Sequence, residues 1–485
     1  MMRFKPLLVP AMWVLFSCAC QQSGKNEPVV PEDPVVPLGT AQVYTTTVSG
    51  QRMAESQLSL GRAEDAIFYK VSPDGAVYQE VDGFGLAVTQ ASCYNLLLMN
   101  AADRTAFLEE VFSREKGIGS SLIRVCIGGS DFSMDEFTWC DTKGIENFAV
   151  HPLDQEYLFP VLDEIYRINP GVKIIASPWS CPRWMKMAEN GGPYDAWTGG
   201  RLNPEYYEAY AQYFVKWIQA MEERGYRISA VTLQNEPLHR GNSMSLYMPW
   251  QDQRDFLKVV GPAFKAAGIQ AGILVYDHNY DVTDYALKLL QDESLSSYIQ
   301  GSAWHNYLGQ VSALDKIHAG APDKDIYFTE ASIGNWNYNF EGCLISDFRD
   351  IFLGTLSRYG KGVTLWNLML DSEHKPFRPG GCDTCWGGVT ISRGDHSLKG
   401  ITRNSHYYNV AHCSKVLQPG AVRLGTTGFT TMGLTYLWFR NPDGSQAVLF
   451  LNENNEQQLV NLVADGVSVP CRVPAKSIQS VLWKK

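Results

Sequence analysis

Residues 228–237 read ISAVTLQNEP, an apolar, β-rich run that ends in three polar side chains and a proline. Runs of this kind recur along the chain, and amphipathic stretches such as 205–225 and 252–268 lie between them. The other runs are SLIRVCIGG (121–129), VKIIASPW (172–179), AGILVYDHN (271–279), GSAWHNY (301–307), DIYFTEAS (325–332) and GVTLWNLML (362–370). Such alternation is typical of a parallel sheet with crossover helices. With one more strand at VDGFGLAVT (81–89), it predicts an α/β fold, a (β/α)8 TIM barrel over residues 81–412.

Two segments with a different pattern flank the predicted barrel. Residues 41–80 hold alternating, β-branched pieces such as AQVYTTTVSG. Residues 413–485 alternate in the same way and contain an Asn-Pro-Asp-Gly turn at 441–444. Alternation with period two, broken by turn residues, is typical of antiparallel strands. We therefore expect both segments to join into one antiparallel β side domain built from the two ends of the chain.

The first 40 residues carry targeting signals and take no part in the predicted fold. Residues 1–20 combine basic side chains with an apolar run too short to span a bilayer, as in a signal peptide. LFSC (15–18) resembles a bacterial lipobox, which makes Cys18 the lipidated residue. Cys20 is a second candidate, and an ordinary secretory signal is the alternative. The Pro-rich residues 21–40 predict an extended linker. We expect secretion across the inner membrane to a bacterial outer membrane or cell surface, with this anchor as the only membrane contact.

The composition excludes some classes of function. The chain has 485 residues, of which 41 are basic and 51 acidic, so its formal net charge is −10. An acidic chain of this kind argues against nucleic acid as a partner. Cys382 and Cys385 have a C-x-x-C spacing, but no second cysteine pair or histidine cluster accompanies them at the spacing of a zinc site. No metal site is therefore expected, and either a local disulfide or two loop thiols fit the pair.

Polar and aromatic side chains follow the predicted strands at the ends where such a barrel holds its active site. They are Asp131, Trp179, Asn235, Glu236, His305, Tyr307, Glu330 and Trp366. Burying unpaired carboxylates is costly, so a purely structural barrel has no need of both Glu236 and Glu330. Glycoside cleavage needs such a pair, because one carboxylic acid protonates the leaving oxygen while the other attacks carbon or activates water. Two capping or ion-paired glutamates are the alternative.

The ordered motifs resemble glycoside hydrolase family 30 from about residue 81 to the C-terminus. The segments that carry the resemblance are DGFGLAVTQAS (82–92), IRVCIGGSDFS (123–133), ASPWSCPRWMK (176–186), AVTLQNEP (230–237), FTEASIG (328–334) and LWNLML (365–370). NEP alone is a weak signal because many barrel hydrolases share it. The ordered set is specific.

The resemblance implies a retaining double displacement, with Glu236 as acid/base and Glu330 as nucleophile. It implies a raised pKa for the acid/base and carboxyl groups about 5–5.5 Å apart. It also places Asp131, Trp179, Asn235, His305, Tyr307 and Trp366 around the first sugar subsite. For His305 a core imidazole is the alternative. Arg124 is expected to pair either with a catalytic carboxylate or with another group inside the barrel.

The chain also departs from the family pattern. Gln90 stands where members often carry Asp, and Asn306 stands where glucosylceramidases usually carry Trp. GGCDTCWGGVTI (380–391) resembles the β-1,6-glucanase branch instead, and its Trp386 is expected either to stack on a sugar or to fill the loop. We therefore expect an endo-β-1,6-glucanase that acts on β-glucan as a monomer, without metal or cofactor. A glucosylceramidase or exo-acting β-glucosidase is the alternative, and a non-catalytic surface glycan-binding lipoprotein is a second one.

Overall fold

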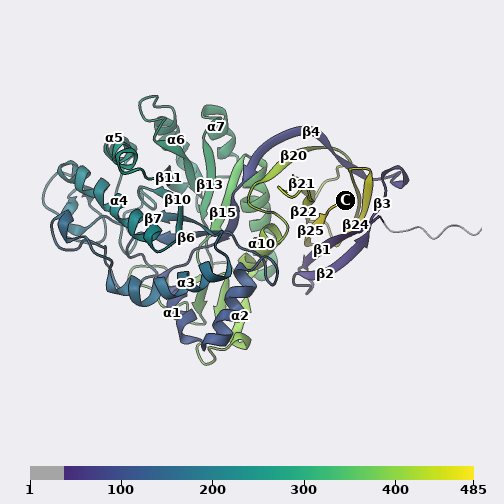
Figure 1. Ribbon diagram of the computed structural model, residues 1–485, viewed down its shortest axis with the longest axis horizontal. Coiled ribbons are helices and arrows are strands. Elements are labelled where there is room, and N and C mark those ends of the chain that lie inside the picture. The colour runs from purple at the N-terminus through teal and green to yellow at the C-terminus, as the bar shows by residue number, and fades with distance from the viewer. Residues whose placement is uncertain (1–37) are drawn as a thin grey trace, which may run out of the picture. The chain divides into compact units, whose positions relative to one another are not determined.

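The computed structural model of the protein describes residues 38–485. The predicted signal peptide, its lipobox and most of the predicted linker at 21–40 lie outside the described residues. Two large sheets organise the described chain, a parallel eight-stranded barrel and a ten-stranded sheet (Figure 1). Among the helices described, none combines the length and the apolar character that crossing a bilayer requires.

The barrel confirms the predicted fold class. Its strands are β5 (Gly83–Leu86), β6 (Leu122–Cys126), β7 (Lys173–Ser177), β10 (Arg227–Thr232), β11 (Gly272–Asn279), β12 (Ile299–His305), β13 (Asp325–Glu330) and β15 (Gly360–Leu365). They are parallel in the order β5-β15-β13-β12-β11-β10-β7-β6. A parallel bridge between Ala87 and Arg124 brings the two end strands together. All eight C-terminal strand ends therefore meet at one mouth.

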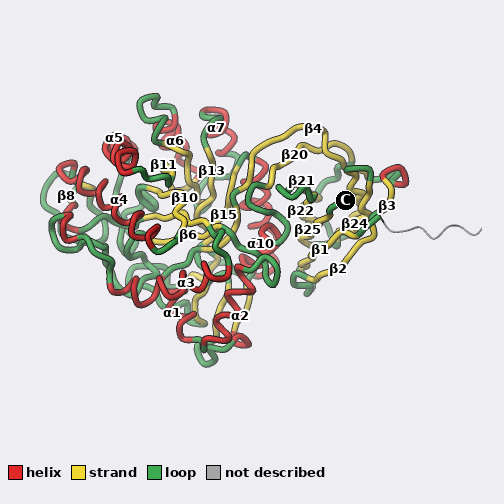
Figure 2. The backbone as a smooth tube through the Cα atoms, in the orientation of Figure 1, coloured by secondary structure: helices red, strands yellow, loops and turns green. Residues whose placement is uncertain are grey.

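Helices cover the outside of the barrel strands (Figure 2). They are α1 (Gln90–Leu98), α2 (Ala101–Phe112), α3 (Phe159–Ile168), α4 (Tyr207–Glu223), α5 (Trp250–Ala267), α6 (Thr283–Leu290), α7 (Ala313–Gly320), α8 (Phe340–Asp347), α9 (Gly354–Ser357) and α10 (Ser405–Ser414). Helix α4 shows why they pack there. It buries Tyr210, Phe214, Trp217 and Met221, whose spacing of three and four residues lines one face of a helix. Helix α5 ends at Gly268, whose φ of 71° suits a residue without a Cβ.

The side domain draws strands from both ends of the chain, as predicted. Its strands are β1 (Thr40–Thr47), β2 (Ala54–Ser59), β3 (Gly61–Arg62), β4 (Lys70–Val81), β20 (Ala421–Gly428), β21 (Leu434–Arg440), β22 (Gln446–Asn452), β23 (Gln458–Ala464), β24 (Val467–Val473) and β25 (Ser477–Trp483). Strand β1 pairs antiparallel with β25 over seven residue pairs, and β4 lies between β20 and β23. The pairing of β23 with β4 is parallel, which the antiparallel prediction did not include. Trp438, Phe450 and Trp483 lie in its core.

His412 joins the barrel to the side domain. It lies on α10, is fully buried, and its two ring nitrogens are each 2.8 Å from a hydroxyl, Ser480 Oγ on β25 and Thr46 Oγ1 on β1. Neutral imidazole suits two hydroxyl partners, because one nitrogen donates while the other accepts. Burial lowers the pKa of His412 to about 3, so the ring stays neutral at this junction.

We expect His412 to make the folded state sensitive to acid. An unfolded histidine titrates near pH 6.5, so between about pH 6.5 and 3 the unfolded chain binds a proton that the folded chain excludes. Stability from this group is therefore present above pH 6.5 and is lost as the pH falls. In urea unfolding at pH 7 and pH 4.5, His412→Gln should lose less stability on acidification than the parent protein. His396→Gln is the control. An equal loss in the parent and in His412→Gln would contradict the assignment.

Candidate active site

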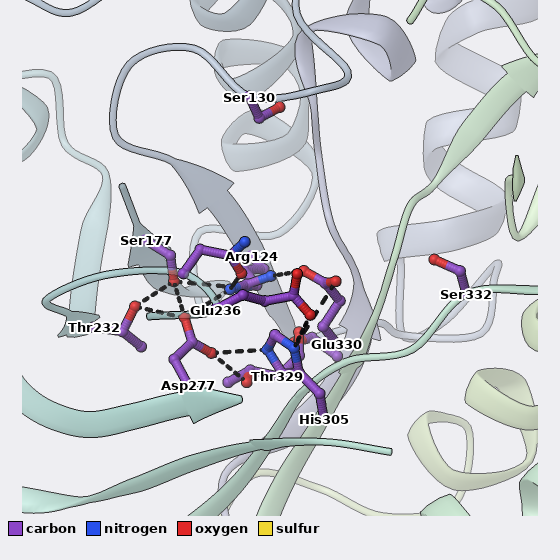
Figure 3. Close-up of polar contacts among 12 residues, drawn as sticks. Arg124, Ser130, Ser177, Thr232, Glu236, Asp277, His305, Thr329, Glu330 and Ser332 are labelled. Carbon is purple, nitrogen blue, oxygen red and sulfur yellow. Dashed lines mark hydrogen bonds and ion pairs between the residues drawn. The ribbon is translucent and has the colours of Figure 1, made fainter. Parts of the chain in front are cut away.

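Layers of side chains fill the barrel, because successive residues of a strand face opposite sides. One apolar layer contains Leu122, Ile175, Ala230, Leu274, Ala303 and Tyr327. Two residues further along five of these strands, and so on the same face, stand Arg124, Ser177, Thr232, His305 and Thr329. A polar layer therefore lies directly above the apolar one, at the strand ends that form the barrel mouth (Figure 3).

Strand β11 supplies the sixth member of the polar layer through a β-bulge. Its register against β12 shifts between Tyr276 and His278, and both Tyr276 and Asp277 have a positive φ, 77° and 65°. A bulge adds one residue and re-aims the side chains that follow. Asp277 therefore faces the barrel interior three residues after Leu274, whereas Tyr276 packs against Trp304, with ring centroids 5.0 Å apart. Asp277 stands near the end of the run AGILVYDHN, but it was not among the residues predicted for the site, because regular alternation does not direct it inward.

Arg124 holds the polar layer together. Its Nη1 donates to Glu330 Oε2 at 2.5 Å, and its Nη2 donates to Asp277 Oδ2 and Asn235 Oδ1, each at 2.8 Å. Both expectations for Arg124 are thus met, since it pairs with Glu330 and with an interior carboxylate. The guanidinium is fully buried, and multiple charge-assisted hydrogen bonds offset the cost of removing it from water.

Glu236 and Glu330 face each other at the barrel mouth. Glu330 is the last residue of β13, and Glu236 follows β10 in a left-handed backbone conformation with φ 45°. The backbone N–H of Glu236 donates to the carbonyl of Asp277 at 3.0 Å, which fixes this unusual turn. One carboxylate oxygen of each glutamate lies within 4.8 Å of the other. Oxygens this close are compatible with a retaining pair, whose carboxyl groups lie about 5–5.5 Å apart.

His305 lies between the carboxylates. Its Nε2 is 3.1 Å from Asp277 Oδ1, and its Nδ1 is 3.4 Å from Glu236 Oε1 and 3.9 Å from Glu330 Oε1 (Figure 3). Burial opposes protonation of the ring, but the three surrounding carboxylates outweigh burial and raise the pKa of His305 to about 9. His305 is therefore fully buried, as a core histidine would be, yet positively charged.

The pKa values of the glutamates shift in opposite directions. Burial raises the pKa of Glu330, and the nearby charges of Glu236 and Asp277 add to this against the pull of His305 and Arg124. Burial also acts to raise the pKa of Glu236, but the hydrogen bond and charge of His305 outweigh it, so the pKa of Glu236 is lowered. This is the reverse of the raised value expected for the acid/base. Two carboxyl groups this close share one proton over a range of pH.

A cleft of about 640 Å³ opens over the two glutamates. Its lining includes Asp131, Tyr307, Trp366 and the Cys382–Cys385 disulfide. The Tyr307 hydroxyl donates to Glu330 Oε1 at 3.0 Å. Of the other sequence-predicted residues, Trp179, Asn235 and His305 are buried beneath these groups. The ring of Trp179 stacks on Trp366 with centroids 4.9 Å apart.

Two buried polar atoms at the cleft have unused hydrogen-bonding capacity. Asp131 Oδ1 and Trp179 Nε1 have no hydrogen-bond partner anywhere in residues 38–485. An unpaired polar atom costs free energy when it is buried, so a ligand hydroxyl that pairs with it removes that cost. Burial, followed by the charges of Glu330 and Glu236, holds the pKa of Asp131 well above its usual range.

The disulfide loop forms one wall of the cleft. Strand β17 (Cys385–Trp386) pairs antiparallel with β14 (Ile333–Gly334), which follows Glu330. The sequence allowed a disulfide or two thiols, and the structure has the disulfide. Trp386 stacks on Tyr338, and its Nε1 donates to Asn335 Oδ1 at 2.7 Å. Of the two expectations for Trp386, the packed position fits loop filling.

Three residues at the mouth have the spacing of a metal site. Donor atoms of Glu236, His305 and Glu330 all lie within 4.8 Å of one another. An imidazole binds metal only when it is neutral. With a pKa of about 9, His305 is an imidazolium at neutral pH, and Arg124 already contacts Glu330. These three residues are therefore better suited to sharing protons and charge than to holding an ion.

We expect Arg124→Met to destabilise the protein strongly. The substitution leaves Asp277 and Glu330 buried without their cation, and breaking a buried ion pair costs about 3–5 kcal/mol. Denaturant unfolding measures the change. The matched control is Arg62→Met, which breaks an exposed pair with Glu64 and should change stability by less than about 1 kcal/mol. Similar values for the two variants would contradict this account of the polar layer.

A closed (β/α)8 barrel whose mouth holds two facing glutamates defines a barrel glycosidase, and comparison with known proteins agrees. The chain belongs to glycoside hydrolase family 30. Residues 81–417 match the glycosyl hydrolase family 30 TIM-barrel domain, and residues 420–481 match the glycosyl hydrolase family 30 beta sandwich domain. The protein is therefore a glycosidase.

Similar proteins include glucanases and glucosylceramidases. An endo-1,6-β-D-glucanase of Trichoderma harzianum is 31% identical over 82% of this chain and 83% of its own length. The lysosomal acid glucosylceramidase of Mus musculus is 26% identical over 93% of this chain and 91% of its own length. Among solved structures, the endo-β-1,6-glucanase BT3312 has a TM-score of 0.87 and 46% identity, covering 92% of this chain and 100% of that one.

Proposed function

We propose that the protein is an endo-β-1,6-glucanase that cleaves its substrate by double displacement, with Glu236 as acid/base and Glu330 as nucleophile. The observation that carries the proposal is the facing glutamate pair in a barrel 46% identical to an endo-β-1,6-glucanase over nearly the whole chain. In the first step, Glu330 attacks the anomeric carbon while Glu236 gives its proton to the departing glycosidic oxygen. In the second step, water attacks the same carbon, Glu236 takes the proton of that water, and Glu330 leaves.

Substrate binding must redistribute the shared proton for this mechanism. In the free protein, the charge of His305 favours ionised Glu236 and burial favours protonated Glu330. A glycosidic oxygen beside Glu236 accepts a hydrogen bond from its acid form, and positive charge developing on the sugar ring favours ionised Glu330. The transition state therefore draws the proton toward Glu236. Arg124 and Tyr307 stabilise the Glu330 carboxylate that results.

The rim of the cleft supports a polymeric substrate. Trp336 and Leu308 line it with 52% and 58% of their surface exposed, and Tyr307 is 41% exposed beside them. Exposed aromatic and aliphatic side chains offer apolar surfaces to the faces of sugar rings that extend past the glutamates. This arrangement favours endo action, because additional sugars of a chain can lie on the rim.

Glucosylceramide hydrolysis is the second candidate, because glucosylceramidases of 26–27% identity also align over most of the chain. A linkage-defined panel separates the candidates. The protein should release oligosaccharides from the β-1,6-glucan pustulan and should be far less active on glucosylceramide, β-1,3-glucan and β-1,4-glucan. Release of glucose alone from pustulan would indicate exo action, and no products would defeat the proposal.

We also propose that the enzyme is secreted, lipid-anchored and monomeric. Support comes only from the sequence, since Cys18 and Cys20 lie outside the described residues. In a bacterial host, labelled palmitate should enter the parent protein but not a Cys18→Ala variant, which should move to the soluble fraction. Labelling that persists in Cys18→Ala but disappears in Cys20→Ala would assign Cys20.

A further inference from the structure

His278 lies in the β11 bulge beside Asp277, and the proposed double displacement assigns no role to it. It follows Asp277 on β11, lines the cleft and is only 8% exposed. Its Nδ1 has no hydrogen-bond partner within residues 38–485 and lies 4.0 Å from Glu236 Oε1. Buried imidazole nitrogens are rarely left unpaired, so this position calls for an explanation.

The position of His278 relative to the two glutamates indicates which part of a substrate it meets. In a double displacement the nucleophile lies beneath the sugar that is attacked, and the acid/base lies beside the departing oxygen. His278 Nδ1 lies 4.0 Å from Glu236 Oε1, and Leu238, His239 and Asn242, which follow Glu236 in the chain, line the same cleft. The surface around His278 therefore faces the leaving group.

The charge state of His278 suits hydrogen bonding and not proton transfer. Burial lowers the pKa of His278 to about 4, although the charge of Glu236 opposes this, so the ring is neutral near pH 7. A neutral imidazole has one N–H donor and one acceptor nitrogen. The unpaired Nδ1, 4.0 Å from Glu236 Oε1, can take either role toward a ligand hydroxyl beside the acid/base.

We propose that His278 binds the leaving-group sugar and so determines specificity for a carbohydrate, as opposed to an aryl or lipid, leaving group. The inference rests on the proposed function. A β-1,6 bond departs through a primary alcohol, and the additional CH2 group gives the bond an extra rotatable torsion. Holding the ring hydroxyls of the departing sugar restricts that torsion and keeps its O6 beside Glu236. The ligand is therefore a gluco-oligosaccharide, which His278 contacts through the ring hydroxyls of the departing sugar.

The test compares two substrates with the same attacked sugar and different leaving groups. His278→Phe keeps a ring of similar size and removes both nitrogens, and His278→Gln restores an acceptor and a donor. For a β-1,6-gluco-oligosaccharide, kcat/KM of His278→Phe should fall about tenfold to 100-fold, as for the loss of a substrate hydrogen bond. For dinitrophenyl β-gentiobioside, whose leaving group is dinitrophenolate and not a sugar, kcat/KM of His278→Phe should change by less than about threefold. His278→Gln should recover part of the loss, and the control His318→Phe should match the parent.

A second measurement isolates binding of the leaving-group sugar. The glycosyl-enzyme is trapped with a 2-fluoro glycoside, and its reactivation is followed in water and in gentiobiose. Gentiobiose should accelerate reactivation of the parent but not of His278→Phe, whereas reactivation by water should be the same in both.

The outcomes separate failure of this inference from failure of the proposed function. Equal losses of His278→Phe on both substrates, or no loss on either, would overturn the role in leaving-group binding. A parent enzyme that cleaves the aryl glycoside but no β-1,6-oligosaccharide would instead defeat the proposed function. In that case, reactivation with glucose as the acceptor still decides whether His278 holds a departing sugar.

Discussion

Glu330→Gln should lower kcat on β-1,6-glucan by at least about 10⁴-fold, the size of effect seen when a covalent nucleophile is removed. The amide of Gln cannot attack the anomeric carbon, yet its oxygen can still accept a hydrogen bond from Tyr307. The substitution also takes one carboxylate from Arg124, which keeps Asp277 as its partner. Folding should therefore persist while turnover is lost. Thermal unfolding followed by circular dichroism checks the fold, and reducing-sugar release checks the turnover.

The smaller variant Glu330→Ala identifies the role of the lost group. The space left beneath the sugar admits azide, which then attacks the anomeric carbon from the nucleophile's side and releases an α-glycosyl azide from an activated β-glycoside. Glu341→Gln, at an exposed position on α8, is the matched control and should retain full activity. Unchanged hydrolysis by a folded Glu330→Gln would remove Glu330 from the mechanism. The non-catalytic alternative, a glycan-binding protein, would instead require that the parent protein itself release no sugar.

The barrel could be predicted because each strand carries its own local signal. Runs such as KIIAS at β7 and DIYFTE at β13 are apolar and β-rich, and the last residue of each run is polar. The side domain was predictable for a similar reason, since alternation in both chain ends reports a half-buried sheet. The parallel pairing of β23 with β4 was not predictable, because alternation gives the faces of a strand but not its neighbour.

The site was predictable wherever strands keep their regular alternation. Arg124 and His305 stand at positions that the two-residue period directs to the barrel interior, and Glu330 was found by its place at the end of β13. Asp277 and His278 were not predicted because the β11 bulge reverses which residues of that strand face inward. Asp277 has a left-handed φ, but no glycine marks the position in the sequence. The positive charge of His305 could not be predicted from the sequence either, because it depends on three carboxylates that come from separate strands and loops.

Glu236→Ala should impair the enzyme to an extent that depends on the leaving group. A sugar leaves as a poorly stabilised alkoxide unless it is protonated, so kcat on pustulan should fall by about 10²–10⁴-fold, the usual contribution of a general acid. Dinitrophenolate leaves without protonation, so the covalent intermediate should still form from a dinitrophenyl β-glycoside. Its hydrolysis should be slow, because no base activates water, and a burst followed by slow turnover is expected.

Azide and pH identify the position and task of Glu236. Azide needs no base, so it should restore turnover of Glu236→Ala and give a β-glycosyl azide, the opposite anomer to that from Glu330→Ala. In the parent, we expect activity to fall at alkaline pH as the proton shared by the two glutamates is lost. Without Glu236 that alkaline limb should disappear for the dinitrophenyl substrate. The same anomer from both alanine variants would mean that the two glutamates do not lie on opposite sides of the bond, and the double displacement assigned to them would be wrong.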